Sequence, residues 1–87
     1  MENNKLNFFK ALSSPTRLKI VEALMKKEHC ACELPQIVGR AQPTVSLELK
    51  KLFEYGIVER RKEGTKCIYS ISDGNVRGMI KTVFAKD

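Results

Sequence analysis

The chain has 87 residues, a formal net charge of +6, a sequence pI near 9.4 and three cysteines. A chain of this length is expected to form one small domain, 1–87, which buries only about 60% of its unfolded surface. An odd number of cysteines does not match the even disulfide framework of small secreted domains, and no apolar run approaches the roughly 20 residues of a membrane span. The polar start, MENNKLNFF, does not resemble a signal peptide. We therefore expect a cytoplasmic protein with reduced thiols, and its basic charge favours nucleic acid as a partner.

Two amphipathic helices are expected at the start of the chain. The first covers residues 2–13, with Leu6 and Phe9 on its apolar face. The second begins at Pro15, where Ser14 is placed to cap it, because a serine oxygen accepts from a free N–H at a helix start. Apolar residues then recur at helical spacing as far as the lysines at 26 and 27.

Two further helical patterns, residues 33–38 and 43–54, are separated by a turn that contains Gly39. The second pattern carries one apolar stripe, which consists of Val45, Leu49, Leu52 and Phe53. Two helices joined in this way are typical of a helix-turn-helix. The opposite face holds short hydrogen-bonding side chains and lysines, as a recognition helix does where it meets base edges. That face consists of Thr44, Ser46, Leu47, Glu48, Lys50 and Lys51.

A β-hairpin is expected next, because residues 57–62 and 66–71 are rich in β-branched and aromatic side chains around Gly64. Its tip is basic and contains Arg60, Arg61, Lys62 and Lys66. A basic hairpin directly after a helix-turn-helix predicts a wing that lies along phosphates. The alternative interpretation is a solvated strand edge, since lysines also protect exposed edges from pairing.

The last segment, 73–87, is expected to be a helix that begins at an Asp73 cap. Its apolar stripe is wide for a terminal helix, so part of it covers the domain's own core and the excess predicts a dimer interface. A homodimer would present two recognition helices to half-sites about one DNA turn, ~34 Å, apart. The expected interface residues are Leu6, Phe9, Met79, Ile80, Val83 and Phe84.

Three motifs resemble the ArsR/SmtB family of bacterial and archaeal winged-helix repressors. They are FKALSSPTRLKI at 9–20, QPTVSLELKKL at 42–52, and GIV at 56–58 with Arg60, Arg61, Gly64 and Tyr69. The resemblance spans nearly the whole chain. It implies a mainly α fold with a small β-wing, an α+β winged helix-turn-helix in the order helix, helix, helix-turn-helix, β-hairpin, helix.

The resemblance also implies a function. Family members are homodimeric repressors of operons for metal resistance, metal efflux or redox response, and they leave operator DNA when an inducer binds. No cofactor is expected to be required for folding. The expected DNA-binding residues are Gln42, Thr44, Ser46, Leu47, Lys50, Lys51, Arg60, Arg61, Lys62 and Lys66.

Two positions depart from the family pattern. Glu48 stands where the family usually has histidine, and a carboxylate repels phosphate unless it accepts from a cytosine amino group or a neighbouring lysine. Leu47 replaces a position that is often basic or polar, and a leucine there would contact a thymine methyl group. Both changes leave the operator sequence unpredictable.

The stretch HCACELP, 29–35, is the candidate sensor. Cys30 and Cys32 match the first two cysteines of the ELCVCDLC stretch in the family's arsenic sensors, but the third falls on Pro35. By the same resemblance, the residues that enter the helix-turn-helix would form a short strand beside the one that Cys67 starts. Cys67 would then complete a three-sulfur site, whose soft thiolates suit As(III), Sb(III) or Cu(I) as an inducer.

Two other interpretations of the cysteines stay open. A redox switch is one, because the helix that starts at Glu33 would lower the pKa of the Cys32 thiol. A direct Cys30–Cys32 bond would close a strained ring, so intersubunit pairing or pairing with Cys67 is expected instead. Alternatively, all three are small buried residues without a sensing role, since free cysteine is among the most buried residue types.

An enzyme is not expected. The Cys-x-Cys spacing is not that of a thioredoxin-like motif, and no Gly-rich phosphate loop is present. His29 is interpreted as a solvated or capping side chain rather than a ligand. The alternatives from other classes are a winged helix that binds protein, and a thiol-based metal carrier.

Overall fold

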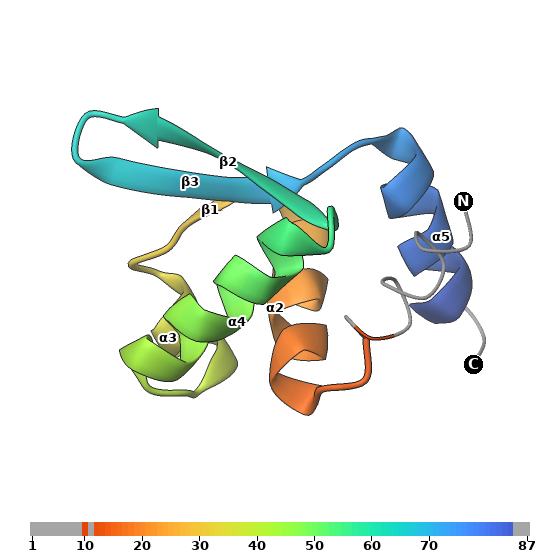
Figure 1. Ribbon diagram of the computed structural model, residues 1–87, viewed down its shortest axis with the longest axis horizontal. Helices are drawn as coiled ribbons and strands as arrows, with labels where there is room; N and C mark the ends of the chain where they lie inside the picture. The colour runs from red at the N-terminus through yellow and green to blue at the C-terminus, as the bar shows by residue number, and fades with distance from the viewer. Residues whose placement is uncertain (1–9, 11, 85–87) are drawn as a thin grey trace.

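The computed structural model describes residue 10 and residues 12–84. Its elements are α2 Pro15–Lys26, β1 His29–Cys30, α3 Leu34–Val38, α4 Gln42–Glu54, β2 Val58–Glu63, β3 Lys66–Ile71 and α5 Gly74–Phe84. This order confirms the expected winged helix-turn-helix (Figure 1). The helix expected at 2–13 lies, except for Lys10, Leu12 and Ser13, outside the described residues. Within the described part, none of the helices has the length and apolar character needed to span a membrane.

Helix α2 begins as its sequence predicts. Ser14 has extended backbone angles, and its hydroxyl oxygen accepts a hydrogen bond from the Arg17 N–H at 3.3 Å. Pro15 occupies the first turn, where its missing N–H is not needed. The cap therefore fixes the point at which the chain enters α2.

Replacement of Ser14 by alanine is expected to lower the free energy of unfolding by about 1 kcal/mol, because an N–H at the helix start loses its acceptor. Urea denaturation followed by circular dichroism measures this loss. The Ser14→Asp variant should keep most of the stability, since aspartate caps equally well. Equal losses in the two variants would contradict a capping role.

The turn between α3 and α4 depends on one glycine. Gly39 has φ +71°, a left-handed conformation that side chains rarely adopt, and its N–H donates to the Pro35 carbonyl at 2.9 Å. Pro43 then lies in the first turn of α4. Together these residues end one helix and start the next within a few positions, which sets the direction of α4.

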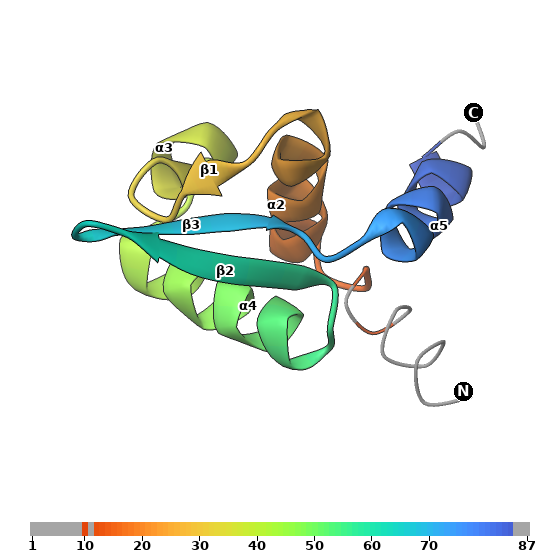
Figure 2. The ribbon, with the colours of Figure 1, turned by 90° about the horizontal axis from the view of Figure 1, so that it is seen from above.

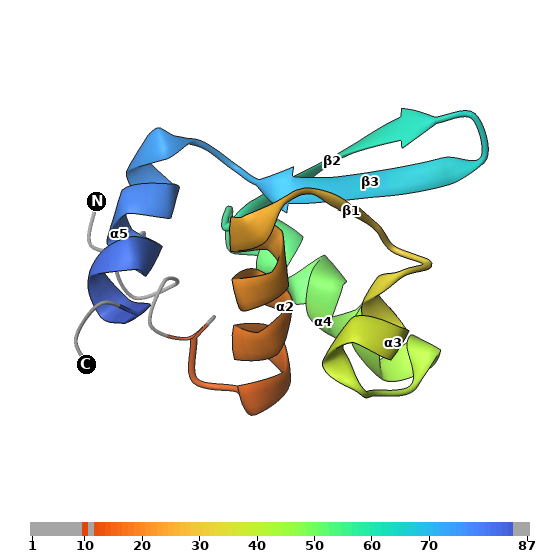
Figure 3. The ribbon, with the colours of Figure 1, turned by 180° about the vertical axis from the view of Figure 1, so that it is seen from behind.

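The sheet has three antiparallel strands in the order β1-β3-β2. His29 lies opposite Tyr69, and Arg60 lies opposite Tyr69 on the other side of β3. The short strand expected beside β3 is thus confirmed, and Gly64 turns the hairpin with φ +64°. Figure 2 shows the hairpin extending past the helices, with α4 along β2 and with α2 and α3 toward β1. Seen from behind in Figure 3, the loop after β1 leads directly into α3.

The core is formed mainly by aliphatic side chains from the helices and from β2, together with Tyr69 and Ile71 of β3. The largest fully buried side chains are Ile20, Val21, Leu24, Leu34, Val45, Leu49, Leu52, Val58 and Ile80. The α4 stripe is confirmed at Val45, Leu49 and Leu52. Phe53 was expected in the same stripe and this is wrong, because it lies at the edge of the stripe, 38% exposed, beneath Arg60.

Helix α5 begins at the expected cap, where the Asp73 carboxylate accepts from the Val76 N–H at 3.0 Å. Ile80 is fully buried, whereas Met79 and Val83 are 38% and 37% exposed. This burial assigns Ile80 to the chain's own core rather than to an exposed dimer interface. Residues Leu6 and Phe9 and the side chain of Phe84, which were expected at the same interface, lie outside the described part.

Candidate nucleic-acid interface

One face of α4 is open to solvent. Val45, Leu49 and Leu52 anchor the helix to the core, so most residues on the other side of the helix stay exposed. That other side carries the predicted DNA-binding residues of α4: Gln42, Thr44, Ser46, Leu47 and Lys50 are exposed, and Lys51 is half-buried. The helix therefore presents a mixed polar and basic surface.

Leu47 is an exposed apolar side chain near the centre of this surface. It is 52% exposed, more than any other large apolar side chain in the described residues. The Leu47 side chain is therefore free to make an apolar contact with a partner. A thymine methyl group in a major groove would supply such a contact.

The wing divides its basic residues between two faces. Successive side chains in a strand point to opposite sides, so Arg60 and Lys62 share the face of buried Val58. The Arg60 guanidinium lies 4.0 Å from the centroid of the Phe53 ring, which confirms that this face is turned toward α4. Arg60 and Lys62 thus add positive charge beside the exposed surface of α4.

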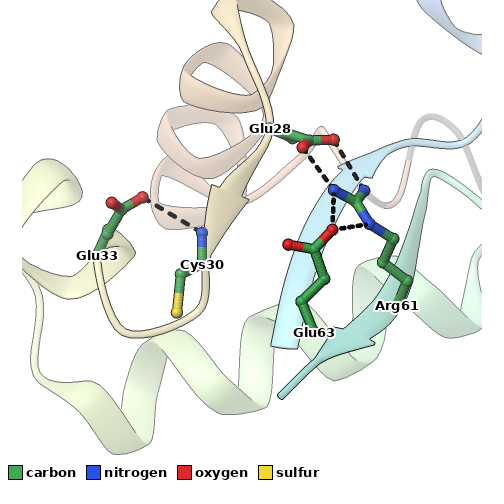
Figure 4. Close-up of polar contacts among 5 residues, drawn as sticks. All are labelled: Glu28, Cys30, Glu33, Arg61 and Glu63. Carbon is green, nitrogen blue, oxygen red and sulfur yellow. Dashed lines mark hydrogen bonds and ion pairs between the residues drawn. The ribbon is translucent and has the colours of Figure 1, made fainter. Parts of the chain in front are cut away.

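Arg61 points to the other face of the wing. Its guanidinium donates to both oxygens of Glu28, at 2.9 and 2.7 Å, and also contacts Glu63 (Figure 4). Hydrogen bonds from Arg61 lower the pKa of Glu28. Two carboxylates therefore pair with the Arg61 guanidinium, which the sequence pattern did not indicate. The pair also ties β2 to the residue that precedes β1.

The CAC stretch forms a tight loop at the end of β1. Glu33 N–H donates to the Cys30 carbonyl at 2.9 Å, and Cys32 N–H donates to the Cys30 sulfur at 3.3 Å. This fold brings the Cys30 and Cys32 sulfur atoms together as a pair, with their Cα atoms 5.2 Å apart. The expectation that these two residues would not pair directly is therefore corrected, because the loop turns residues two apart to the same side.

The side chain of Glu33 forms hydrogen bonds that stabilise the same loop. Its carboxylate accepts from the Cys30 N–H at 3.2 Å and lies 3.0 Å from His29 Nδ1 (Figure 4 shows the contact with Cys30). The hydrogen bond with His29, followed by that from Cys30, lowers the pKa of Glu33. His29 was expected to be a solvated or capping side chain; its side chain is only 11% exposed, so it is not solvated, and it contacts Glu33 within this loop.

Cys67 does not form a metal-binding cluster with the other two cysteines in the described residues. Cys30 lies opposite Ile68 in the strand register, so Cys67, which is adjacent to Ile68, points to the other face of the sheet. Over residue 10 and residues 12–84, no cluster of three or more histidine, cysteine, aspartate or glutamate side chains is placed to hold a metal ion. The residues present fit a two-thiol site and do not fit the three-sulfur site.

A surface hollow of about 400 Å³ joins the cysteine loop to α4 and the wing. Cys30, Ala31 and Cys32 line one side of it, and residues 65–67 of the wing line another. Gln42 and Ser46 from the start of α4 complete the wall. A molecule bound to the loop would therefore lie between the start of α4 and the wing turn.

Sequence reasoning missed the partners of two side chains at this surface. Glu48 was considered as a DNA-facing carboxylate, but it lies 2.7 Å from the Nε of Arg17 on α2. Phe53 was expected in the apolar stripe, but its ring lies against the Arg60 guanidinium. Arg17 is 31 positions from Glu48, and Arg60 lies on a different element from Phe53. The helical spacing of α4 residues therefore does not predict either contact.

Residues 14–60 match the family model described as "Bacterial regulatory protein, arsR family". A probable mercury resistance operon repressor of Streptomyces lividans is 37% identical over 73 residues, which are 84% of this chain and 58% of that protein. MJ1325 of Methanocaldococcus jannaschii, an uncharacterized HTH-type transcriptional regulator, is 42% identical over 86% of this chain and 85% of its own length. An arsenical resistance operon repressor of Staphylococcus xylosus is 40% identical over 72% of this chain and 61% of that protein.

Several solved structures share the fold. The homodimeric winged helix-turn-helix DNA-binding domain of Mb0332 from Mycobacterium bovis, a possible ArsR-family transcriptional regulator, matches with a TM-score of 0.89 and 29% identity. The match covers 94% of this chain and 76% of that domain. The transcriptional repressor BigR from Xylella fastidiosa has a TM-score of 0.84 and 33% identity over 97% of this chain and 86% of that structure. Sequence, fold and surface agree, and the chain belongs to the ArsR family of bacterial regulatory proteins.

Proposed function

We propose that the protein is a homodimeric transcriptional repressor that binds operator DNA through α4 and the wing. The observation that carries this proposal is the exposed, polar and basic face of α4, with Arg60 and Lys62 directed to the same side. The α4 side chains would meet base edges in the major groove, and the wing would follow the phosphates. Relatives named as repressors support this assignment.

The homodimer is supported by the partly exposed apolar side chains of α5. Met79 and Val83 form an apolar surface on a helix at one end of the domain (Figure 1). The solved Mb0332 domain, which has the same fold, is homodimeric. A second copy would cover this surface and place two α4 helices about one turn of DNA, ~34 Å, apart.

The salt dependence of DNA affinity tests this role and separates the two faces of the wing. Lys62→Ala should weaken binding on every duplex and reduce the slope of log affinity against log salt by about 0.9, because one phosphate contact is lost. Arg61→Ala is the matched control, and its slope should stay near that of the unmodified protein, since Glu28 and Glu63 already pair with Arg61. Identical slopes for Lys62→Ala and the unmodified protein would refute a phosphate contact at Lys62.

We also propose that a thiol-directed inducer binds Cys30 and Cys32 and weakens DNA binding. The hollow that joins the CAC loop to Gln42, Ser46 and the wing turn supports this proposal. Soft thiolates suit As(III), Sb(III) and other thiophilic metals, and relatives are named for mercury and arsenical resistance. A coupling of about 1–3 kcal/mol between the two sites would lower DNA affinity by roughly 5- to 150-fold.

A redox response is the second candidate, and the pairing of the Cys30 and Cys32 sulfurs favours it. Peroxide would oxidise the two thiols to a disulfide, with reduction of peroxide to two molecules of water. Parallel titrations of the reduced, DNA-bound protein with arsenite, antimonite, Cu(I), Zn(II) and peroxide distinguish the two candidates. Release by arsenite or antimonite alone supports metalloid sensing, release by peroxide alone supports redox sensing, and release by none contradicts a thiol-directed inducer.

A further inference from the structure

An ion pair with little exposure joins the first turn of α2 to the middle of α4. The Arg17 Nε lies 2.7 Å from a Glu48 carboxylate oxygen, although the two residues are 31 positions apart. Their side chains are only 13% and 15% exposed. Solvent therefore screens this pair less than the wing pair of Arg61 and Glu28, whose side chains are 47% and 49% exposed.

Arg17 makes two further contacts around the same point. Its Nη1 donates to the Lys10 carbonyl at 2.8 Å, and its guanidinium lies 5.8 Å from the centroid of the Tyr55 ring. Tyr55 is the residue that ends α4. One guanidinium thus contacts the middle of α4, the end of α4 and the chain that precedes α2.

Glu48 lies on the border between the two faces of α4. Leu47 before it is exposed, and Leu49 after it is fully buried. No other ion pair in the described part of the chain includes an α4 side chain. Apolar packing of the stripe is non-directional, so rotation of α4 about its axis is opposed most specifically by directional contacts. The hydrogen-bonded ion pair with Arg17 supplies one in the middle of the helix, and the contact of Arg60 with Phe53 supplies another near its end.

We infer that Arg17 and Glu48 are positioning residues that set the rotation of α4 on α2, and thereby decide which bases the exposed face of α4 reaches. This inference rests on the proposed DNA binding. Glu48 does not itself read a base, because its carboxylate is turned to Arg17 and little of it is exposed. Glu48 is therefore a positioning residue. Because Arg17 balances its negative charge, Glu48 adds little repulsion toward DNA phosphates.

Four variants test the inference: Arg17→Gln, Glu48→Gln, the double variant, and Glu54→Gln as the matched control on α4. Glu54 is exposed and forms no ion pair within the described residues. The first readout is the ratio of affinities for a duplex selected by the unmodified protein from a random library and for a scrambled duplex. The second is the orientation of α4 relative to α2 in the free protein, measured by NMR residual dipolar couplings.

Each single variant at the pair should lower the affinity ratio on the order of tenfold, or about 1.4 kcal/mol, with little change on the scrambled duplex. The dipolar couplings of α4 should change in the same variants, while Glu54→Gln should match the unmodified protein in both readouts. The double variant should lose less than the sum of the single losses. If Arg17→Gln does not fold, Arg17→Lys and Glu48→Asp replace the pair, since they keep both charges but alter the separation.

Other outcomes would overturn the inference. A changed preference at one base pair in Glu48→Gln, with no effect of Arg17→Gln, would show that Glu48 reads a base directly. Unchanged dipolar couplings in both single variants would show that the pair does not position α4. If the unmodified protein prefers no duplex, the proposed function fails, and the couplings of the free protein still decide the role of the pair.

Discussion

Replacement of both Cys30 and Cys32 by serine is expected to abolish the release of the protein from DNA by its inducer. Serine has nearly the shape of cysteine, but its hydroxyl is a poor ligand for thiophilic metals and cannot form a disulfide. Cys32 is exposed, whereas Cys30 is buried, 7% exposed, but lies outside the main cluster of core side chains. Because serine fills nearly the same space at both positions, DNA affinity without inducer should stay within about twofold of the unmodified value.

Fluorescence anisotropy with a labelled duplex measures both quantities in one titration with arsenite and one with peroxide. Cys67→Ser is the matched control, because Cys67 lines the same hollow but is on the other face of the sheet from Cys30 in the strand register. This control should respond to the inducer as the unmodified protein does. A double variant that still leaves DNA, or a Cys67→Ser variant that no longer does, would contradict a two-thiol sensor at Cys30 and Cys32.

The second large effect is expected from two leucines on opposite faces of α4. Leu52 is fully buried, so Leu52→Ala should lower the free energy of unfolding by about 2–5 kcal/mol, through lost apolar burial and a residual cavity. A domain of this size has a total stability of about 5–15 kcal/mol, so the variant will be partly unfolded at moderate temperature. Urea denaturation measures the change.

Leu47→Ala makes the same chemical change on the exposed face of the same helix. Because Leu47 is 52% exposed, its loss should change stability by no more than about 0.5 kcal/mol. It should instead reduce the preference for a duplex with thymine at the contacted position. Equal losses of stability in the two variants would show that α4 does not have one buried and one free face.

Much of the fold was predictable from local patterns. The α4 stripe, the Ser14 and Asp73 caps, and the turns at Gly39 and Gly64 each depend on residues a few positions apart. Such signals arise from backbone geometry and from helical or strand periodicity, which a single sequence displays. The order of these elements was sufficient to predict the winged helix-turn-helix.

The ion pairs around the α4 and wing surface were not predictable from local patterns. Arg17 and Glu48 are 31 residues apart, and Arg61 and Glu28 are 33 apart, so their pairing depends on tertiary structure alone. From the sequence alone, any basic residue in the wing is interpreted as a phosphate ligand, because the sequence does not show whether a carboxylate pairs with it. Only the strand register shows that Lys62 is directed toward α4 and Arg61 away from it.

The cysteine loop gives a third example of this limit. The spacing of Cys30 and Cys32 alone suggested that a direct pair would be strained, but the loop is folded by bonds that spacing does not reveal. Glu33 accepts from the Cys30 N–H, and its own N–H donates to the Cys30 carbonyl. These bonds turn the chain back and bring the two sulfurs together, next to the start of α4.

The central claim is that α4 is anchored by one face and meets DNA with the other. Titration of the isotopically labelled protein with a selected duplex, followed by NMR chemical shifts at low salt, tests it most directly. The account predicts the largest changes at Thr44, Ser46, Leu47 and Lys50 and along the α4-facing side of the wing. Changes confined to the outer face of α2 and α3, or no changes at all in dilute buffer, would contradict it.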